Sequence, residues 1–143
     1  MIPVSLGSEK TTASFFESMD YADEAIKSMT AMLNRYHTAE VYIGVDKHGN
    51  PCGIDLNEYD VQSVQNIIKT MVNTQPTVRV TLHKTEEGDY IRIEATGYDI
   101  PYSFGKWFYV RRCSYERNDE SGEIEPRWIQ TITCGMKRHR AFF

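Results

Sequence analysis

Four cationic residues lie close together in the last third of the sequence, with aromatic residues between them. The cationic residues are Lys106, Arg111, Arg112 and Arg117. The aromatic residues are Trp107, Tyr109 and Tyr115. Guanidinium and ammonium groups along one strand can contact phosphates, and aromatic rings can stack on exposed bases. The pattern therefore permits a nucleic-acid-binding strand. The alternative is that the aromatic rings belong to the core and the arginines pair with neighbouring acids, namely Glu116, Asp119 and Glu120.

The charge of the chain is distributed unevenly. The whole chain has a formal net charge of −4, but residues 1–100 carry −7 and residues 101–143 carry +3. Such asymmetry can mark a surface that binds a polyanion. The alternative is a solvated C-terminal surface with no ligand. Residues 137–140, with the sequence Lys-Arg-His-Arg, would add phosphate contacts in the first case and form a solvated terminus in the second.

Other patterns that would indicate catalysis or a bound metal are missing from the sequence. The three cysteines have unrelated spacings, which predicts neither a disulfide framework nor a metal site. The four histidines lack the spacing of zinc ligands. His48 precedes Cys52 by four residues, but no third group is marked that would orient a catalytic base. Because no glycine-rich phosphate loop occurs either, we expect no metal and no cofactor.

Hydrophobic periodicity predicts two helices. The first spans about residues 21–36, and the second begins at Asn57 or Asp60 and stops before Pro76. An apolar run over residues 41–45 predicts a buried strand. The turn residues after it indicate a short return strand over residues 51–55.

Alternating residues predict the second half of the fold. Residues 77–84 and 90–96 each alternate apolar and polar side chains, which predicts an antiparallel hairpin with one buried face. Residues 107–113 are predicted to form a further strand. Residues 123–133 fit either a helix interrupted near Pro126 or a terminal strand, and the pattern alone does not decide between them.

Length and element order together predict the fold class. The 143 residues, 41% of them hydrophobic, suit one domain spanning residues 1–143. The predicted elements follow the order helix, hairpin, helix, hairpin, strand. This order favours an α+β domain, in which a mostly antiparallel or mixed sheet packs against two or three helices. The sequence begins without the pattern of a signal peptide and contains no long apolar stretch, so we expect a cytoplasmic protein that makes no contact with a membrane.

Three blocks of the sequence resemble the divergent AlbA-type domain of Schlafen-like proteins and bacterial transcriptional regulators, the AlbA-2 family. The blocks are Tyr42-Ile43-Gly44-Val45-Asp46 with Gly53-Ile54-Asp55; Tyr90-Ile91-Arg92-Ile93-Glu94 with Pro101-Tyr102; and Tyr109-Val110-Arg111 with Ser114, Arg117 and Glu123-Ile124. The resemblance is strongest over residues 41–124. It implies an AlbA-like fold and a nucleic-acid-binding module of a transcriptional-regulator type, with DNA expected before RNA. Small AlbA-like folds often pair, so a homodimer is also expected.

The enzymatic branch of this family is a ribonuclease with three acidic residues. Such carboxylates hold divalent cations that neutralise charge on a phosphate. Glu9 fits the first acidic position and Asp46 the third, but Ser14 occupies the second. The resemblance therefore favours a degenerate site and a noncatalytic protein. The alternatives are a metal-dependent ribonuclease that uses Glu9 and Asp46, and a protein-interaction module.

Overall fold

The computed structural model describes residues 11–117, 120, 122 and 124–132. Its main sheet has four strands in the order β1-β2-β5-β4. These strands are β1 (Ala13–Phe16), β2 (Thr38–Ile43), β4 (Thr77–Thr85) and β5 (Gly88–Thr96). β1 runs parallel to β2, and the other pairs are antiparallel, so the sheet is mixed. Apolar residues alternate along the strands, which buries Val41, Ile43, Ile91 and Ile93 on one face.

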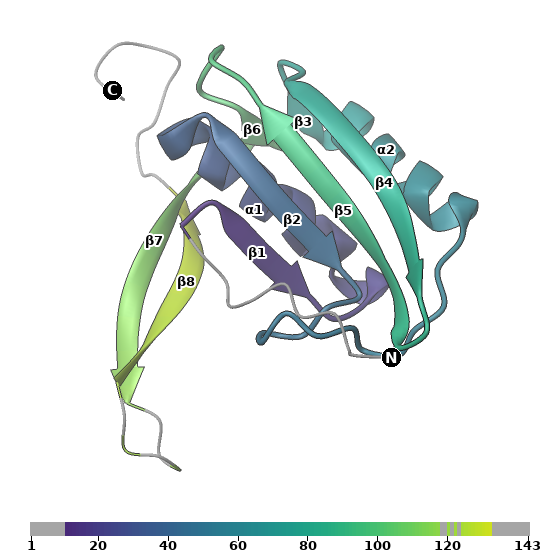
Figure 1. The fold of residues 1–143 in the computed structure, drawn as a ribbon. Helices are drawn as coiled ribbons and strands as arrows, with labels where there is room; N and C mark the ends of the chain where they lie inside the picture. Colours follow the sequence, from purple (N-terminus) through teal and green to yellow (C-terminus); the bar gives the residue numbers. More distant parts are fainter. Residues whose placement is uncertain (1–10, 118–119, 121, 123, 133–143) are drawn as a thin grey trace.

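A second sheet in the described residues contains four strands in the order β3-β6-β7-β8. Its strands are β3 (Val72–Asn73), β6 (Ser103–Phe104), β7 (Trp107–Arg117) and β8 (Ile124–Ile132). β8 decides the open alternative at the end of the chain in favour of a strand. The β7–β8 hairpin is paired from Tyr109–Ile132 to Arg117–Ile124 and projects away from the main sheet (Figure 1).

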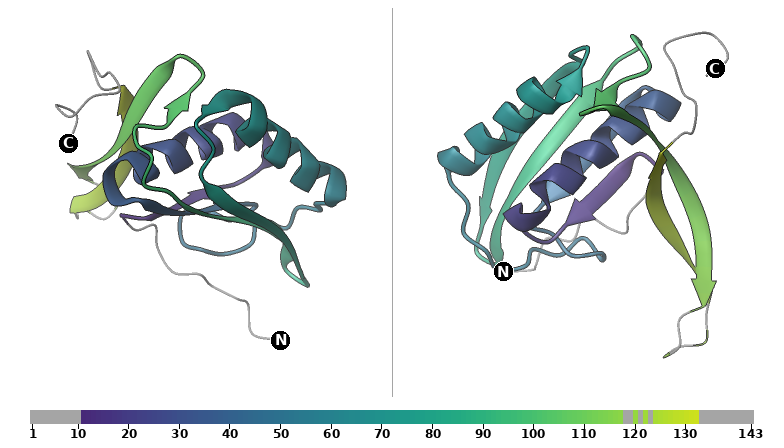
Figure 2. Two further views of the ribbon diagram at one scale, coloured as in Figure 1. Left: turned by 90° about the horizontal axis from the view of Figure 1, so that it is seen from above. Right: turned by 180° about the vertical axis from the view of Figure 1, so that it is seen from behind.

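Two helices cover one face of the main sheet (Figure 2). A single 3-10 turn, η1 (Met19–Tyr21), leads into α1 (Ala22–Tyr36), and α2 (Glu58–Met71) follows the loop after β2. Asn57 is the N-cap of α2 and forms a capping box with Asp60, so the earlier of the two predicted starts is confirmed. No helix among the described residues is long and apolar enough to cross a bilayer. The predicted α+β class is confirmed.

Helix α1 is buried on more sides than its apolar stripe predicts. Ser28 and Thr30 are buried together with the apolar stripe, because α1 packs against β7 as well as against the main sheet. Asn34 fixes this second contact. Its Nδ2 donates to the carbonyl oxygens of Tyr102 and Tyr109, each at 2.9 Å, and its Oδ1 accepts from the Tyr102 amide. The helix therefore positions β7, the strand that carries most of the predicted cations.

One predicted element is wrong. Residues 51–55 do not form a return strand; a single bridge joins Val45 and Pro51. The edge of β2 that such a strand would have used is already paired with β1 and β5. The loop is instead held in place by Asp89, the second residue of β5. The carboxylate of Asp89 accepts a hydrogen bond from the Leu56 amide at 3.0 Å.

Candidate nucleic-acid interface

Arg111 lies in the interior of the protein. Its side chain is 1% exposed and reaches between β1 and α1. Nη2 donates to the carbonyl oxygen of Ala13 at 3.0 Å, and Nη1 donates to the hydroxyls of Ser14 and Ser28. A guanidinium held in this way does not reach a phosphate at the surface. The expected phosphate contact at Arg111 is therefore replaced by a structural role, and the interface has to be built from the remaining cations.

The other three predicted cations are exposed. Arg112 follows Arg111 on β7 and, because side chains alternate along a strand, projects to the opposite face. Lys106 lies in the turn between β6 and β7, and Arg117 ends β7. Within the described part of the chain, none of the three forms an ion pair with a carboxylate. Their charges therefore remain available to a ligand.

Arg112 shares a surface pocket with Arg35, a residue that the sequence analysis did not single out. The pocket has a volume of about 310 Å³ and lies where the end of α1 meets β7. It is lined by Arg35, Tyr36, Arg111, Arg112 and Cys113. Arg35 is exposed, and no described carboxylate pairs with it. Both residues line this pocket, and guanidinium groups suit a phosphate, which accepts paired N–H donors.

The sequence did not mark Arg35 as a binding residue, because its position in a helix has an ordinary structural explanation. An arginine in the last turn of a helix stabilises the negative end of the helix dipole, whether or not it binds anything else. Only the packing of β7 against α1 brings Arg35 to Arg112.

The aromatic residues of β7 divide between core and surface. Tyr109 is 8% exposed, and the Lys27 ammonium lies 5.0 Å from its ring centroid. Tyr109 is therefore a core residue, as the alternative explanation held. Trp107 is 57% exposed and remains accessible for stacking. The Tyr115 side chain lies outside the part of the structure that is described.

Of the two predicted acidic residues, only Asp46 lies in the described part of the chain. Oδ1 of Asp46 accepts from the amides of His48 at 2.8 Å and Asn50 at 3.0 Å, so it stabilises its own turn. Ser14, at the position of the missing acid, is buried against Arg111. Glu9 lies outside the described residues. In the part that is described, no group of three or more histidine, cysteine, aspartate and glutamate side chains could hold a metal ion.

Cys52 has the wrong electrostatic environment for a nucleophile. Burial raises the pKa of its thiol, and the carboxylates of Glu17 and Asp46 raise it further. An activated cysteine needs the opposite shift, toward the thiolate. This shift gives no support to a catalytic role for His48 and Cys52.

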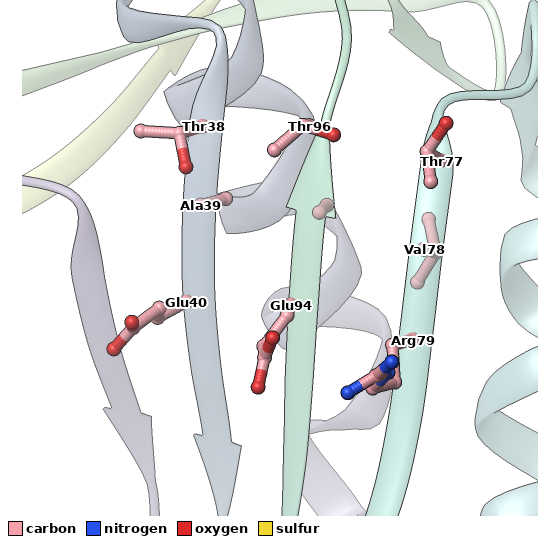
Figure 3. A pocket seen from close by; sticks show the side chains of 9 residues that line it. Thr38, Ala39, Glu40, Thr77, Val78, Arg79, Glu94 and Thr96 are labelled. Atoms are coloured by element: carbon pink, nitrogen blue, oxygen red, sulfur yellow. The ribbon is translucent and has the colours of Figure 1, made fainter.

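A larger hollow, of about 450 Å³, lies on the face of the main sheet opposite the helices (Figure 3). Its exposed end carries Thr38, Thr77 and Thr96, and further along lie Arg79 and the carboxylates of Glu40 and Glu94. Arg92 bridges the two glutamates at 3.2 Å and 2.7 Å. The charges here offset one another, so this hollow is a weaker polyanion site than the pocket at Arg35 and Arg112.

A tyrosine next to this network has a strongly shifted pKa. Burial, followed by a hydrogen bond to Glu40, raises the pKa of Tyr42 to about 12. Tyr42 therefore stays a neutral donor to the Glu40 carboxylate at any ordinary pH.

Comparison with protein-family models gives one match over most of the chain. The model described as Schlafen, AlbA_2 matches residues 9–121. The matched range contains Ser14, Arg35, Asp46 and Arg112. No curated protein matches the chain.

Proposed function

Because this chain belongs to the Schlafen AlbA_2 family, we propose that it is a noncatalytic nucleic-acid-binding module of a transcriptional-regulator type. The proposed ligand is DNA in preference to RNA, and the proposed location is the cytoplasm. The observation that carries the proposal is the pocket between α1 and β7, where Arg35 and Arg112 lie exposed without a described acidic partner. Phosphate oxygens are the ligands that such a pair of guanidiniums recognises best.

The negative net charge of the protein limits the long-range attraction of a nucleic acid. The protein as a whole is acidic, with a net charge of −4, so long-range attraction of a polyanion is weak. Binding therefore depends on direct contacts by a few local cations. Lys106 and Arg117, exposed at the two ends of β7, add two further cations, and alternation along β7 places Arg117 on the face opposite Arg112.

The acidic residues support a noncatalytic module rather than a ribonuclease. A metal-dependent nuclease needs several carboxylates around one cation. Asp46 is engaged by two backbone amides of its own turn, and a buried serine stands where the second acid would be. A homodimer is part of the proposal, because it would present two Arg35–Arg112 pockets to one nucleic acid. Sedimentation with and without nucleic acid tests that part.

Binding is tested by fluorescence anisotropy with duplex DNA, single-stranded DNA and single-stranded RNA. Four phosphate contacts would weaken duplex binding roughly a hundredfold between about 50 and about 200 mM salt. Arg35→Glu/Arg112→Glu should abolish most binding and reduce the salt slope by about two. The matched control is Lys47→Glu/Lys69→Glu, which changes two exposed lysines elsewhere and alters the net charge equally.

Two results would overturn the proposal. One is that the wild-type protein binds none of the three nucleic acids at low salt. The other is that both double variants lose affinity equally, since the pocket would then matter only through net charge. A stable oligomer that binds no nucleic acid would favour the protein-interaction module instead.

A further inference from the structure

Tyr98 is an exposed aromatic residue with one face supported by the protein. Its side chain is 78% exposed, in the loop that follows β5. Its ring stacks on the imidazole of His37 with a centroid distance of 4.8 Å and an interplanar angle of 23°. A ring that is stacked on one side and still this exposed presents much of its other face to solvent.

The loop that carries Tyr98 is fixed by hydrogen bonds on both sides of the residue. The Gly97 amide donates to the carbonyl oxygen of His37 at 3.0 Å, and the Asp99 amide donates to Oη of Tyr102 at 3.1 Å. Tyr102 is fully buried. A side chain on Gly97 would collide with the Tyr102 ring. Tyr98 is therefore held in place before any ligand arrives, which lowers the entropy lost on binding.

This ring lies at the same end of α1 as the cationic pocket. His37 caps the C-terminus of α1 in the left-handed conformation, with φ of 66°, and follows Arg35 by two residues. Arg35 and Tyr36 line the pocket that contains Arg112. Tyr98 also lies two residues after Thr96. Thr96 pairs with Thr38 at the rim of the hollow in Figure 3. The end of α1 therefore connects the phosphate-binding groups to the exposed ring.

The charges around Tyr98 are compatible with a nucleic acid. Arg92 already pairs with Glu40 and Glu94, the two glutamates of the neighbouring hollow. Asp99 is exposed and is the one carboxylate adjacent to Tyr98 in the sequence. Arg35, two residues before His37, supplies a cation at the same end of α1.

We propose that Tyr98, supported by His37, stacks on an unpaired base of a strand whose phosphates contact Arg35 and Arg112. The inference rests on the proposed function and narrows its ligand to single-stranded nucleic acid. In a duplex the faces of the bases are covered by their neighbours, so only an unpaired base offers a face to the ring. Stacking accepts any base, so the preference is for single strands and not for a sequence.

The test compares three probes in one anisotropy assay: a single-stranded oligonucleotide, the same strand with abasic sites, and the corresponding duplex. Tyr98→Ala should weaken binding of the intact single strand by at least about fivefold and leave duplex binding unchanged. Tyr98→Phe should bind as the wild type does, because the ring is kept. The abasic strand should bind the wild type and Tyr98→Ala equally. The matched control is Tyr59→Ala on α2, because Tyr59 is also 78% exposed.

The outcomes separate this inference from the proposed function. If Tyr98→Ala binds the single strand like the wild type while Arg35→Glu/Arg112→Glu does not bind, the stacking role is wrong and nucleic-acid binding stands. If Tyr59→Ala loses as much affinity as Tyr98→Ala, the stacking role is also wrong. If the wild type binds no probe at low salt, the proposed function itself fails. A thermal melt of each variant confirms that it is folded.

Discussion

The guanidinium of Arg111 on β7 donates a hydrogen bond to the hydroxyl of Ser14 on β1, inside the protein. The Ser14 and Ser28 hydroxyls lie 2.8 Å apart, so one buried arginine links a strand of each sheet to α1. At Ser14 a carboxylate would face this same guanidinium. The position is thus part of the packing between elements, and this explains why it contributes no metal ligand at the surface.

Arg111→Met should destabilise the protein strongly. The substitution removes the donor to two buried hydroxyls and to the Ala13 carbonyl, and each unsatisfied buried group is costly. We expect a loss of about 3 kcal/mol or more in the free energy of unfolding, measured by urea denaturation. Arg112→Met is the matched control, and its exposed position predicts a change within about 0.5 kcal/mol. Equal stabilities of the two variants would contradict the structural role.

Asp46→Ala should affect the stability of a turn and not the binding of nucleic acid. Its carboxylate accepts from two backbone amides, which predicts a loss of about 1 kcal/mol in the free energy of unfolding. Affinity for single-stranded and duplex probes should be unchanged. Incubation of folded RNA with the wild type and manganese provides the opposing test. Cleavage that disappears in Asp46→Ala would restore the metal-dependent ribonuclease.

Gly88→Ala should destabilise the hairpin between β4 and β5. Gly88 has φ of 137°, and an added Cβ would lie 2.6 Å from the Gly53 amide nitrogen, so both strain and collision oppose it. We expect a loss above about 2 kcal/mol, measured by denaturation. Gly122→Ala is the comparison for a positive φ without a collision, because Gly122 has φ of 75° and no neighbour within 4 Å. It should lose only about 1 kcal/mol. A Gly88→Ala variant no less stable than Gly122→Ala would show that the loop yields to the side chain.

Asp89 should make the stability of the protein fall in acid. The hydrogen bond from the Leu56 amide, followed by that from Lys84, lowers the pKa of Asp89 below its ordinary value of 3.8. A carboxyl with a lowered pKa in the folded state contributes stability above the unfolded value. That contribution is lost as the pH falls through the folded-state pKa. Melting temperatures across this acid range should therefore fall less for Asp89→Asn than for the wild type.

Lys84→Met is a second test of how Asp89 makes the stability depend on pH. It removes the ammonium that lies 3.0 Å from Asp89 Oδ2, so the pKa of Asp89 should move back toward 3.8 and the acid-dependent loss should shrink. If the wild type and both variants lose stability in parallel, Asp89 is not the responsible group.

The sequence alone predicted most of the helices and strands because their signals are local. The spacing of apolar residues marked α1, α2 and the β4–β5 hairpin, and two candidate capping residues bracketed the start of α2. β1 has only four residues and is stabilised by its parallel pairing with β2, so no local pattern revealed it. The false strand at residues 51–55 arose in the same way, because partner choice is not a local property.

For the candidate site, the sequence determined that two adjacent arginines on a strand must point to opposite faces. It could not determine which face would be covered, because that depends on α1 packing against β7 from a distant part of the chain. The tertiary structure therefore decided that Arg111 is buried with Ser14 while Arg112 is exposed. The same packing placed Arg35 and Arg112 around one pocket, while the hydrogen bond from the Gly97 amide to His37 placed Tyr98 on His37.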